Sequence, residues 1–134
     1  MNPDGLIILA SSADPTQTLD RLEAAVTKRG MTVLAHIDHA EAAAKVGLEL
    51  RPTTVLIFGN PRAGTPLMQS AQTMGLDLPL KALVWQDAAG RTWFGYNDPV
   101  WLAHRHGADA GNDEILKTMA AALAAVAAEA AGSL

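Results

Sequence analysis

Five short runs of apolar residues along the chain predict β-strands. These runs are residues 6–10, 31–38, 53–58, 80–86 and 91–96. In the second run Val33, Ala35 and Ile37 alternate with Thr32, Leu34 and His36. This alternation predicts a strand whose two faces are both partly covered. The third run ends in an unbroken apolar stretch, so we expect it at the centre of the sheet.

Capping residues between the runs predict helices. Asp14, which precedes a proline, can cap a helix that Gly30 ends in the left-handed conformation. Asp38 or His39 starts a short helix that stops at Gly47. Further helices are predicted over residues 66–74, 100–105 and 114–130. The apolar stripe of the last helix is Ile115, Met119, Ala122, Leu123 and Val126.

The order of these elements indicates the fold class. Residues 87–90 predict a hairpin turn, so the strands 80–86 and 91–96 follow each other without a helix between them. A doubly wound parallel sheet would need a helix between every two strands. We therefore predict an α+β fold with a mixed or antiparallel sheet, helices packed mainly on one face, and a single domain over residues 1–134.

The stretch from Thr53 to Met68 is the best candidate for a ligand site. We interpret residues 59–65 as a loop in which Asn60 offers an amide, Arg62 a fork of donors, and Gly64 a close approach to the backbone. Thr65 can cap the helix that follows or present its hydroxyl to the ligand. The segment lacks the Gly-Lys-Ser/Thr ending of a Walker loop, so it predicts a site for a small apolar or anionic molecule. The alternative is that Asn60 and Thr65 only cap short helices.

The composition narrows the possible functions. The chain has 134 residues, 49% of them hydrophobic, and no cysteine, which fits one folded core and excludes disulfides, zinc–thiolate sites and thiol nucleophiles. The net charge of −4 disfavours nucleic acid as a partner. The first apolar run is short and lacks a basic start, and no run is long enough to span a membrane. We expect no signal peptide, no membrane partner and a cytoplasmic location.

Six short motifs follow one another over most of the chain. They are residues 37–40 (Ile-Asp-His-Ala), 43–50 (Ala-Ala-Lys-Val-Gly-Leu-Glu-Leu), 56–61 (Leu-Ile-Phe-Gly-Asn-Pro), 64–68 (Gly-Thr-Pro-Leu-Met), 75–81 (Gly-Leu-Asp-Leu-Pro-Leu-Lys) and 96–99 (Tyr-Asn-Asp-Pro). Together they resemble the DUF302 family of small bacterial and archaeal domains of unknown function, over about residues 6–107. The Ala-rich helix at about 114–130 lies at or beyond the edge of the resemblance. The resemblance implies a two-layer fold of the TATA-box-binding-protein-like type, a tendency to form homodimers, and no established activity.

Haem is the most specific ligand that the residues allow. His39 or His36 could be an axial ligand, since one neutral imidazole facing an apolar pocket is sufficient. Residues available to complete such a pocket are Met68, Met74, Arg62 and Lys81. No Cys-x-x-Cys-His motif is present, so covalent attachment is excluded. Methionine on a helix face is more often core filler, and His39 at a helix start is more often a cap.

An enzyme of small-molecule metabolism is the alternative function. Lys81, or His39 together with Asp38, could supply acid–base chemistry. No Gly-x-Ser-x-Gly motif is present, so a serine hydrolase is not expected.

Aromatic residues gather in the second half of the chain. The hairpin carries Trp85 and Trp93 on the face opposite Val84 and Phe94, so both of its faces are apolar. One face belongs to the core, and a second copy of the chain is the simplest cover for the other. We expect a homodimer. The ligand pocket is then expected between residues 59–65, the helix after them, His39 and the Trp85/Trp93 hairpin.

Overall fold

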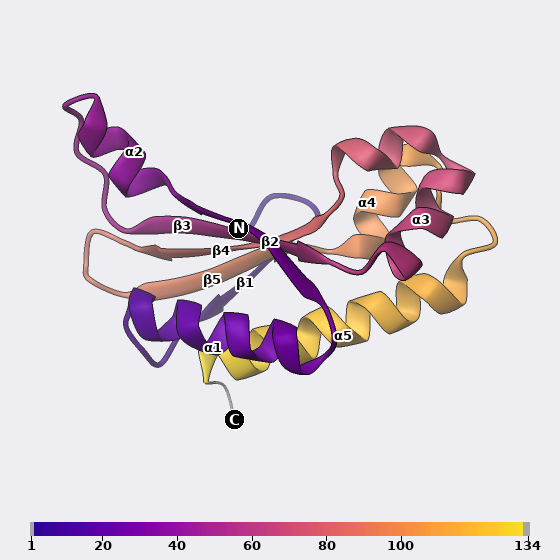
Figure 1. Cartoon of the computed structure of the whole chain (residues 1–134). Helices are drawn as coiled ribbons and strands as arrows, with labels where there is room; N and C mark the ends of the chain where they lie inside the picture. The colour runs from indigo at the N-terminus through magenta and orange to yellow at the C-terminus, as the bar shows by residue number, and fades with distance from the viewer. Residues whose placement is uncertain (1, 133–134) are drawn as a thin grey trace.

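Five antiparallel strands form one sheet in the computed structural model, which describes residues 2–132 (Figure 1). The strands are β1 (Leu6–Ala10), β2 (Thr32–Asp38), β3 (Thr53–Gly59), β4 (Leu80–Gln86) and β5 (Thr92–Asn97). Their order across the sheet is β1-β5-β4-β3-β2. The α+β prediction is confirmed. The expected central position of the third strand is wrong: β1 returns to pair with β5, which leaves β4 in the middle.

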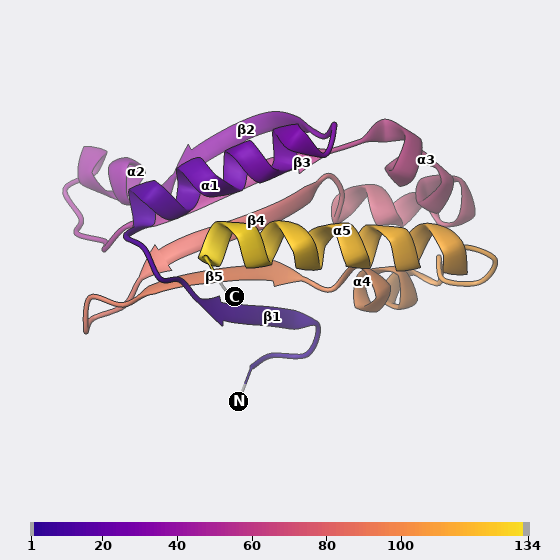
Figure 2. The same ribbon diagram turned by 90° about the horizontal axis from the view of Figure 1, so that it is seen from below.

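Two long helices cover one face of this sheet. Figure 2 shows α1 (Pro15–Lys28) and α5 (Asp113–Ala131) side by side in front of the strands. The core lies between the two layers, and its fully buried members include Leu22, Val26, Phe58, Phe94 and Val126. On α5 the buried stripe begins at Leu116, one position after the predicted Ile115, which is only half-buried. No helix within residues 2–132 is long and apolar enough to cross a membrane.

The other helices lie at the two ends of the sheet. The short helix α2 (His39–Lys45) has no buried residue and projects from one end, on the side away from α1 and α5 (Figure 1). Asp38 caps it by accepting a hydrogen bond from the Glu41 amide at 2.9 Å. At the opposite end lie α3 (Pro61–Ser70), the 3-10 helix η1 (Gln72–Leu76) and α4 (Pro99–His106).

The alternation predicted for the second strand is interrupted by a β-bulge. Val33 pairs with Phe58 and Ala35 with Ile57, so the register shifts between them and Leu34 is the extra residue. Val33 therefore faces the helices, whereas Ala35 and the following Ile37 face the other side. Both faces are partly covered, as predicted, because Val33 and Ala35 are half-buried, whereas Leu34 is 57% exposed and His36 is exposed.

The segment interpreted as a loop is the first half of a helix. Helix α3 starts at Pro61, directly after its cap Asn60 and four residues before the possible cap Thr65, and contains Pro66. Asn60 satisfies the helix start by accepting a hydrogen bond from the Arg62 amide at 3.0 Å. Pro66 falls early enough in the helix that the carbonyl it leaves unpaired belongs to the first turn. The predicted helix over residues 66–74 is thus shifted, and its second half is η1.

Candidate functional site

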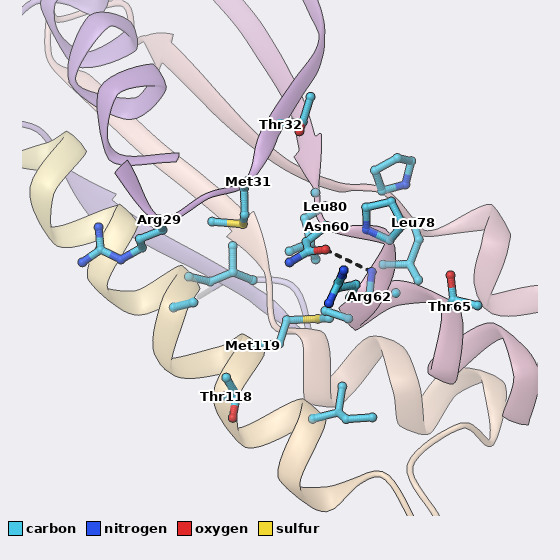
Figure 3. A pocket seen from close by; sticks show the side chains of 18 of the residues that line it. Arg29, Met31, Thr32, Asn60, Arg62, Thr65, Leu78, Leu80, Thr118 and Met119 are labelled. Carbon is cyan, nitrogen blue, oxygen red and sulfur yellow. Dashed lines mark hydrogen bonds between the residues drawn. The ribbon is translucent and has the colours of Figure 1, made fainter. Parts of the chain in front are cut away.

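A cavity of about 970 Å³ opens between α3 and α5 beside the start of β2 (Figure 3). Three stretches that are distant in sequence form its walls. The first is residues 59–65 with Met68 on α3, the second is residues 78–80 before and at the start of β4, and the third is α5 from Glu114 to Leu123. Arg29, Met31, Thr32 and Leu34 close it from the junction between α1 and β2. This volume is near the upper end of the range for small-molecule pockets.

The walls of this cavity, which we call the α3–α5 groove, are mainly apolar. The apolar side chains that line it are Met31, Leu34, Ala63, Met68, Leu78, Leu80, Ile115, Met119, Ala122 and Leu123. Three of them are methionines from different parts of the chain: Met31 lies between α1 and β2, Met68 on α3 and Met119 on α5. Unbranched thioether side chains adapt to ligands of irregular shape. The groove is therefore suited to an apolar group whose shape need not match it closely.

Five of the six predicted ligand residues line this groove: Asn60, Arg62, Gly64, Thr65 and Met68. Whether they bind a ligand stays a prediction, but their individual roles differ from the expectation. The backbone of the helix start is already occupied, since Pro61 has no N–H and the Ala63 and Gly64 amides bond to the Asn60 carbonyl. The backbone N–H groups at this helix start are therefore not open to a ligand. Thr65 caps nothing, because it lies inside α3.

Two arginines reach the groove, and only one has an acidic partner. Arg29 donates hydrogen bonds to both carboxylate oxygens of Glu129, at 3.0 and 3.3 Å, and this contact holds the pKa of Glu129 below its usual value. The Arg62 guanidinium has no hydrogen bond or ion pair within residues 2–132. Figure 3 shows its side chain extending from α3 toward Met119. Arg62 is thus the cation available to a ligand.

His39 does not belong to the groove. It is the first residue of α2, at the opposite end of the sheet from α3, and it is exposed. His36, Met74 and Lys81 do not line the cavity either. His36 is exposed on β2, and Met74 is fully buried. Lys81 donates a hydrogen bond to the Pro79 carbonyl at 3.1 Å. No histidine is among the lining residues, and the chemistry of these walls does not fit haem.

The Trp85/Trp93 hairpin is also separate from the groove. Trp85 and Trp93 are opposite each other on β4 and β5, on the sheet face away from α1 and α5. The Trp93 indole N–H donates to Asp87 at 2.9 Å, and Arg91 lies over its ring at 5.5 Å. The pocket expected between this hairpin and His39 is not formed.

One polar cluster, between η1 and α4, was not predicted. The Asp77 carboxylate accepts hydrogen bonds from His106 Nε2 and, at 2.9 Å, from Arg105. With Nε2 protonated, a neutral His106 accepts from the Thr73 hydroxyl through Nδ1 at 2.9 Å. The hydrogen bond from His106 lowers the pKa of Asp77, and the charge of Arg105 adds to this effect. Residues 77 and 105 are far apart in the sequence, so their contact could not be predicted. The basic residues in the last turn of α4 were the only indication of this cluster.

The residues proposed for acid–base chemistry lack partners for it. Asp38 caps α2, and Lys81 bonds to backbone carbonyls. Among residues 2–132 no three histidine or acidic side chains converge as a metal site would require.

Comparison with known proteins places the chain in a family. The family described as "Domain of unknown function DUF302" matches residues 7–126. This chain belongs to the DUF302 family. The match extends past residue 107 and takes in most of α5, so the Ala-rich helix is part of the family's domain. The fold agrees: a crystal structure of an uncharacterized conserved DUF302 protein from Bacillus stearothermophilus superimposes with a TM-score of 0.84. The two are 25% identical, over 96% of this chain and 99% of that one.

Longer proteins with another name also match this DUF302 chain. "Fluoride-specific ion channel FluC 1" of Brucella suis is 42% identical over 128 residues, which is 96% of this chain and 50% of that protein. "Fluoride-specific ion channel FluC 2" of Brucella melitensis is likewise 42% identical, over 47% of its length. The chain spans about half the length of these relatives.

Proposed function

We propose that this DUF302 domain binds a small, largely apolar ligand in the α3–α5 groove. The observation that carries the proposal is the groove itself, a cavity of about 970 Å³ with apolar walls from α3, α5 and β2. Apolar walls exposed to water cost free energy that a matching ligand recovers, at about 25 cal/mol for each Å² covered. A few polar groups at the edge, among them Arg62 and Asn60, can orient the ligand.

A filled groove tests this proposal. Ala122 lines the groove on α5 and is half-buried, so Ala122→Phe should fill the space without displacing the core. The matched control is Ala124→Phe, at an exposed position of the same helix that does not line the groove. We expect the neutral dye Nile red to fluoresce with the wild-type protein and with Ala124→Phe, and at least tenfold less with Ala122→Phe. Equal fluorescence from all three proteins would refute the proposal, and native mass spectrometry of the purified protein would identify any ligand retained.

We propose in addition that the domain is a homodimer joined through the sheet face away from α1 and α5. Among residues 2–132 no helix covers the middle of that face (Figure 1). Its half-buried apolar side chains include Val55, Ile57, Leu83, Trp85 and Trp93. Five strands of five to seven residues give this face an area of roughly 400 to 500 Å². A stable interface needs about 800 Å² from each partner. The segment that follows α2, residues 46–50, could supply the difference, and we call it the arm. Its side chains Val46, Leu48 and Leu50 are 72%, 64% and 48% exposed.

The FluC-named relatives favour a second role, as a domain that works with a membrane channel. They contain a sequence 42% identical to this chain in one half. We attribute the channel activity in their name to the other half, because the matched half corresponds to the sheet and helices described above. We also propose a cytoplasmic location for the domain, and the absence of cysteine supports it. Vesicles that contain such a channel test this role. Adding a ligand that binds in the groove should change the rate of fluoride efflux. The same ligand should have no effect on the rate when the DUF302 half carries Ala122→Phe.

A further inference from the structure

We infer that the ligand of the α3–α5 groove is a linear amphiphile with one anionic head group, held by Arg62, and an apolar tail lying along α5. This inference rests on the proposed function and adds the chemical class of the ligand. It combines the charge, the polarity and the length of the groove.

The charge comes from Arg62. The charged side chains that line the groove are Arg29, Arg62 and Glu114. Glu129 neutralises Arg29 through two hydrogen bonds, whereas the guanidinium of Arg62 has no such contact within residues 2–132. A free guanidinium beside apolar walls favours a planar carboxylate or a phosphate, which it can bind with two parallel hydrogen bonds. Arg62 is exposed, so beside a neutral ligand its donors would bond only to water, whereas an anionic head group would gain a charge-assisted contact.

The polarity of the walls is uneven. Asn60, Arg62 and Thr65 lie together at the start of α3, where Figure 3 shows them on one side of the groove. The facing stretch of α5 is mainly apolar: it contributes Ile115, Met119, Ala122 and Leu123, with Thr118 among them and Glu114 at its start. An occupant that satisfies both sides must have a polar end and an apolar remainder. A uniformly apolar ring system would match only one wall.

The length of the groove favours a chain. Its α5 wall runs from Glu114 to Leu123, nine helical steps or roughly 14 Å. The methionines that line the groove, Met31, Met68 and Met119, can adapt to the varied conformations of an alkyl tail. A medium-length alkyl chain therefore matches the groove in both length and flexibility.

Ligands that share one tail and differ in head group test the inference. Decanoate, decyl phosphate and decanol are titrated against Nile red bound to the wild-type protein, Arg62→Gln and Arg51→Gln. Arg51 is exposed and lies outside the groove, so it is the matched control. We expect decanoate or decyl phosphate to compete about tenfold more tightly than decanol, with this preference lost in Arg62→Gln and kept in Arg51→Gln. The better of the two acids identifies the head group.

Each other outcome has a definite meaning. If decanol competes as well as both acids, the anionic class is refuted while the groove proposal stands. If the wild-type protein binds neither Nile red nor any of the three compounds, the proposed function itself fails. Binding that appears only after dilution of the protein to monomer would assign the groove to a second copy of the chain, and would also overturn the inference.

Discussion

Asp77 connects η1 to α4 through its hydrogen bonds with His106 and Arg105. The substitution Asp77→Asn removes the negative charge that pairs with Arg105 and leaves the His106 ring, which is 8% exposed, with a weaker acceptor. We expect a loss of about 1–2 kcal/mol in the free energy of unfolding at pH 7, measured by urea denaturation. The control is Asp20→Asn, at an exposed position of α1, which should change stability little.

The same pair of proteins gives a pH dependence with a definite sign. The folded state lowers the pKa of Asp77 from 3.8, so its contribution is complete above that value and is lost as the pH falls through the lower folded pKa. The stability difference between wild type and Asp77→Asn should therefore shrink as the pH is lowered from 5 to 3. A difference that stays constant from pH 5 to pH 3 would show that this contact does not lower the pKa of Asp77.

Gly5 and Gly30 both have positive φ, near 77° and 75°, but only one is crowded. A Cβ at position 5 would overlap the Trp101 ring, whereas nothing lies within 4 Å of a Cβ at position 30. Gly30→Ala should cost roughly 1 kcal/mol, the backbone cost alone. Gly5→Ala should cost clearly more, because Trp101 must also move. Thermal and urea unfolding of the two variants measure this difference, and equal losses would mean that Trp101 does not pack on Gly5.

Among the elements, α3 depends on its first residue. Asn60→Ala removes the acceptor of the Arg62 amide and should lower stability by about 1 kcal/mol. Asn60→Asp keeps an acceptor at the same place and should retain most of that stability. If instead Asn60 served mainly as a ligand donor, both variants would lose Nile red binding with no change in urea midpoint.

The elements whose ends depend on local residues could be predicted from the sequence. Asp14 and Asp38 cap the helices they were expected to cap, and Gly107 ends α4 in the left-handed conformation. Position in the sheet and strand register depend on pairing with distant strands. For this reason the bulge at Leu34 and the central place of β4 could not be derived. Where two start signals followed one another, at Asn60 and Thr65, local pattern alone did not decide between them.

At the scale of the whole molecule, only one wall of the groove could be predicted from the sequence. The residues on α3 were identified because they are consecutive, but the opposite wall comes from α5, more than forty residues later. No pattern in the sequence relates Met119 to Arg62, since their proximity depends on how α5 crosses the sheet. The misplaced His39 has the same cause: α2 follows β2 to the far end of the molecule.

The homodimer proposal predicts the effect of a charge on the uncovered sheet face. Val55 is half-buried on that face of β3, so Val55→Lys should leave the core intact and place an ammonium group in the interface. Light scattering should give the wild-type protein twice the chain mass of 14.0 kDa and this variant a single chain mass. Ala24→Lys, exposed on α1, is the control and should remain dimeric.

The arm that follows α2 makes the sharper test, because the sheet face alone offers only roughly 400 to 500 Å². Leu48→Ser removes an apolar side chain that is 64% exposed in one chain, and we expect it to weaken the dimer about tenfold or more if the partner buries that side chain. Leu76→Ser changes a leucine that is 78% exposed at the opposite end of the molecule, and should leave the dissociation constant unchanged. Equal effects of the two substitutions would exclude the arm from the interface. A wild-type protein of 14.0 kDa at micromolar concentration would refute the dimer altogether.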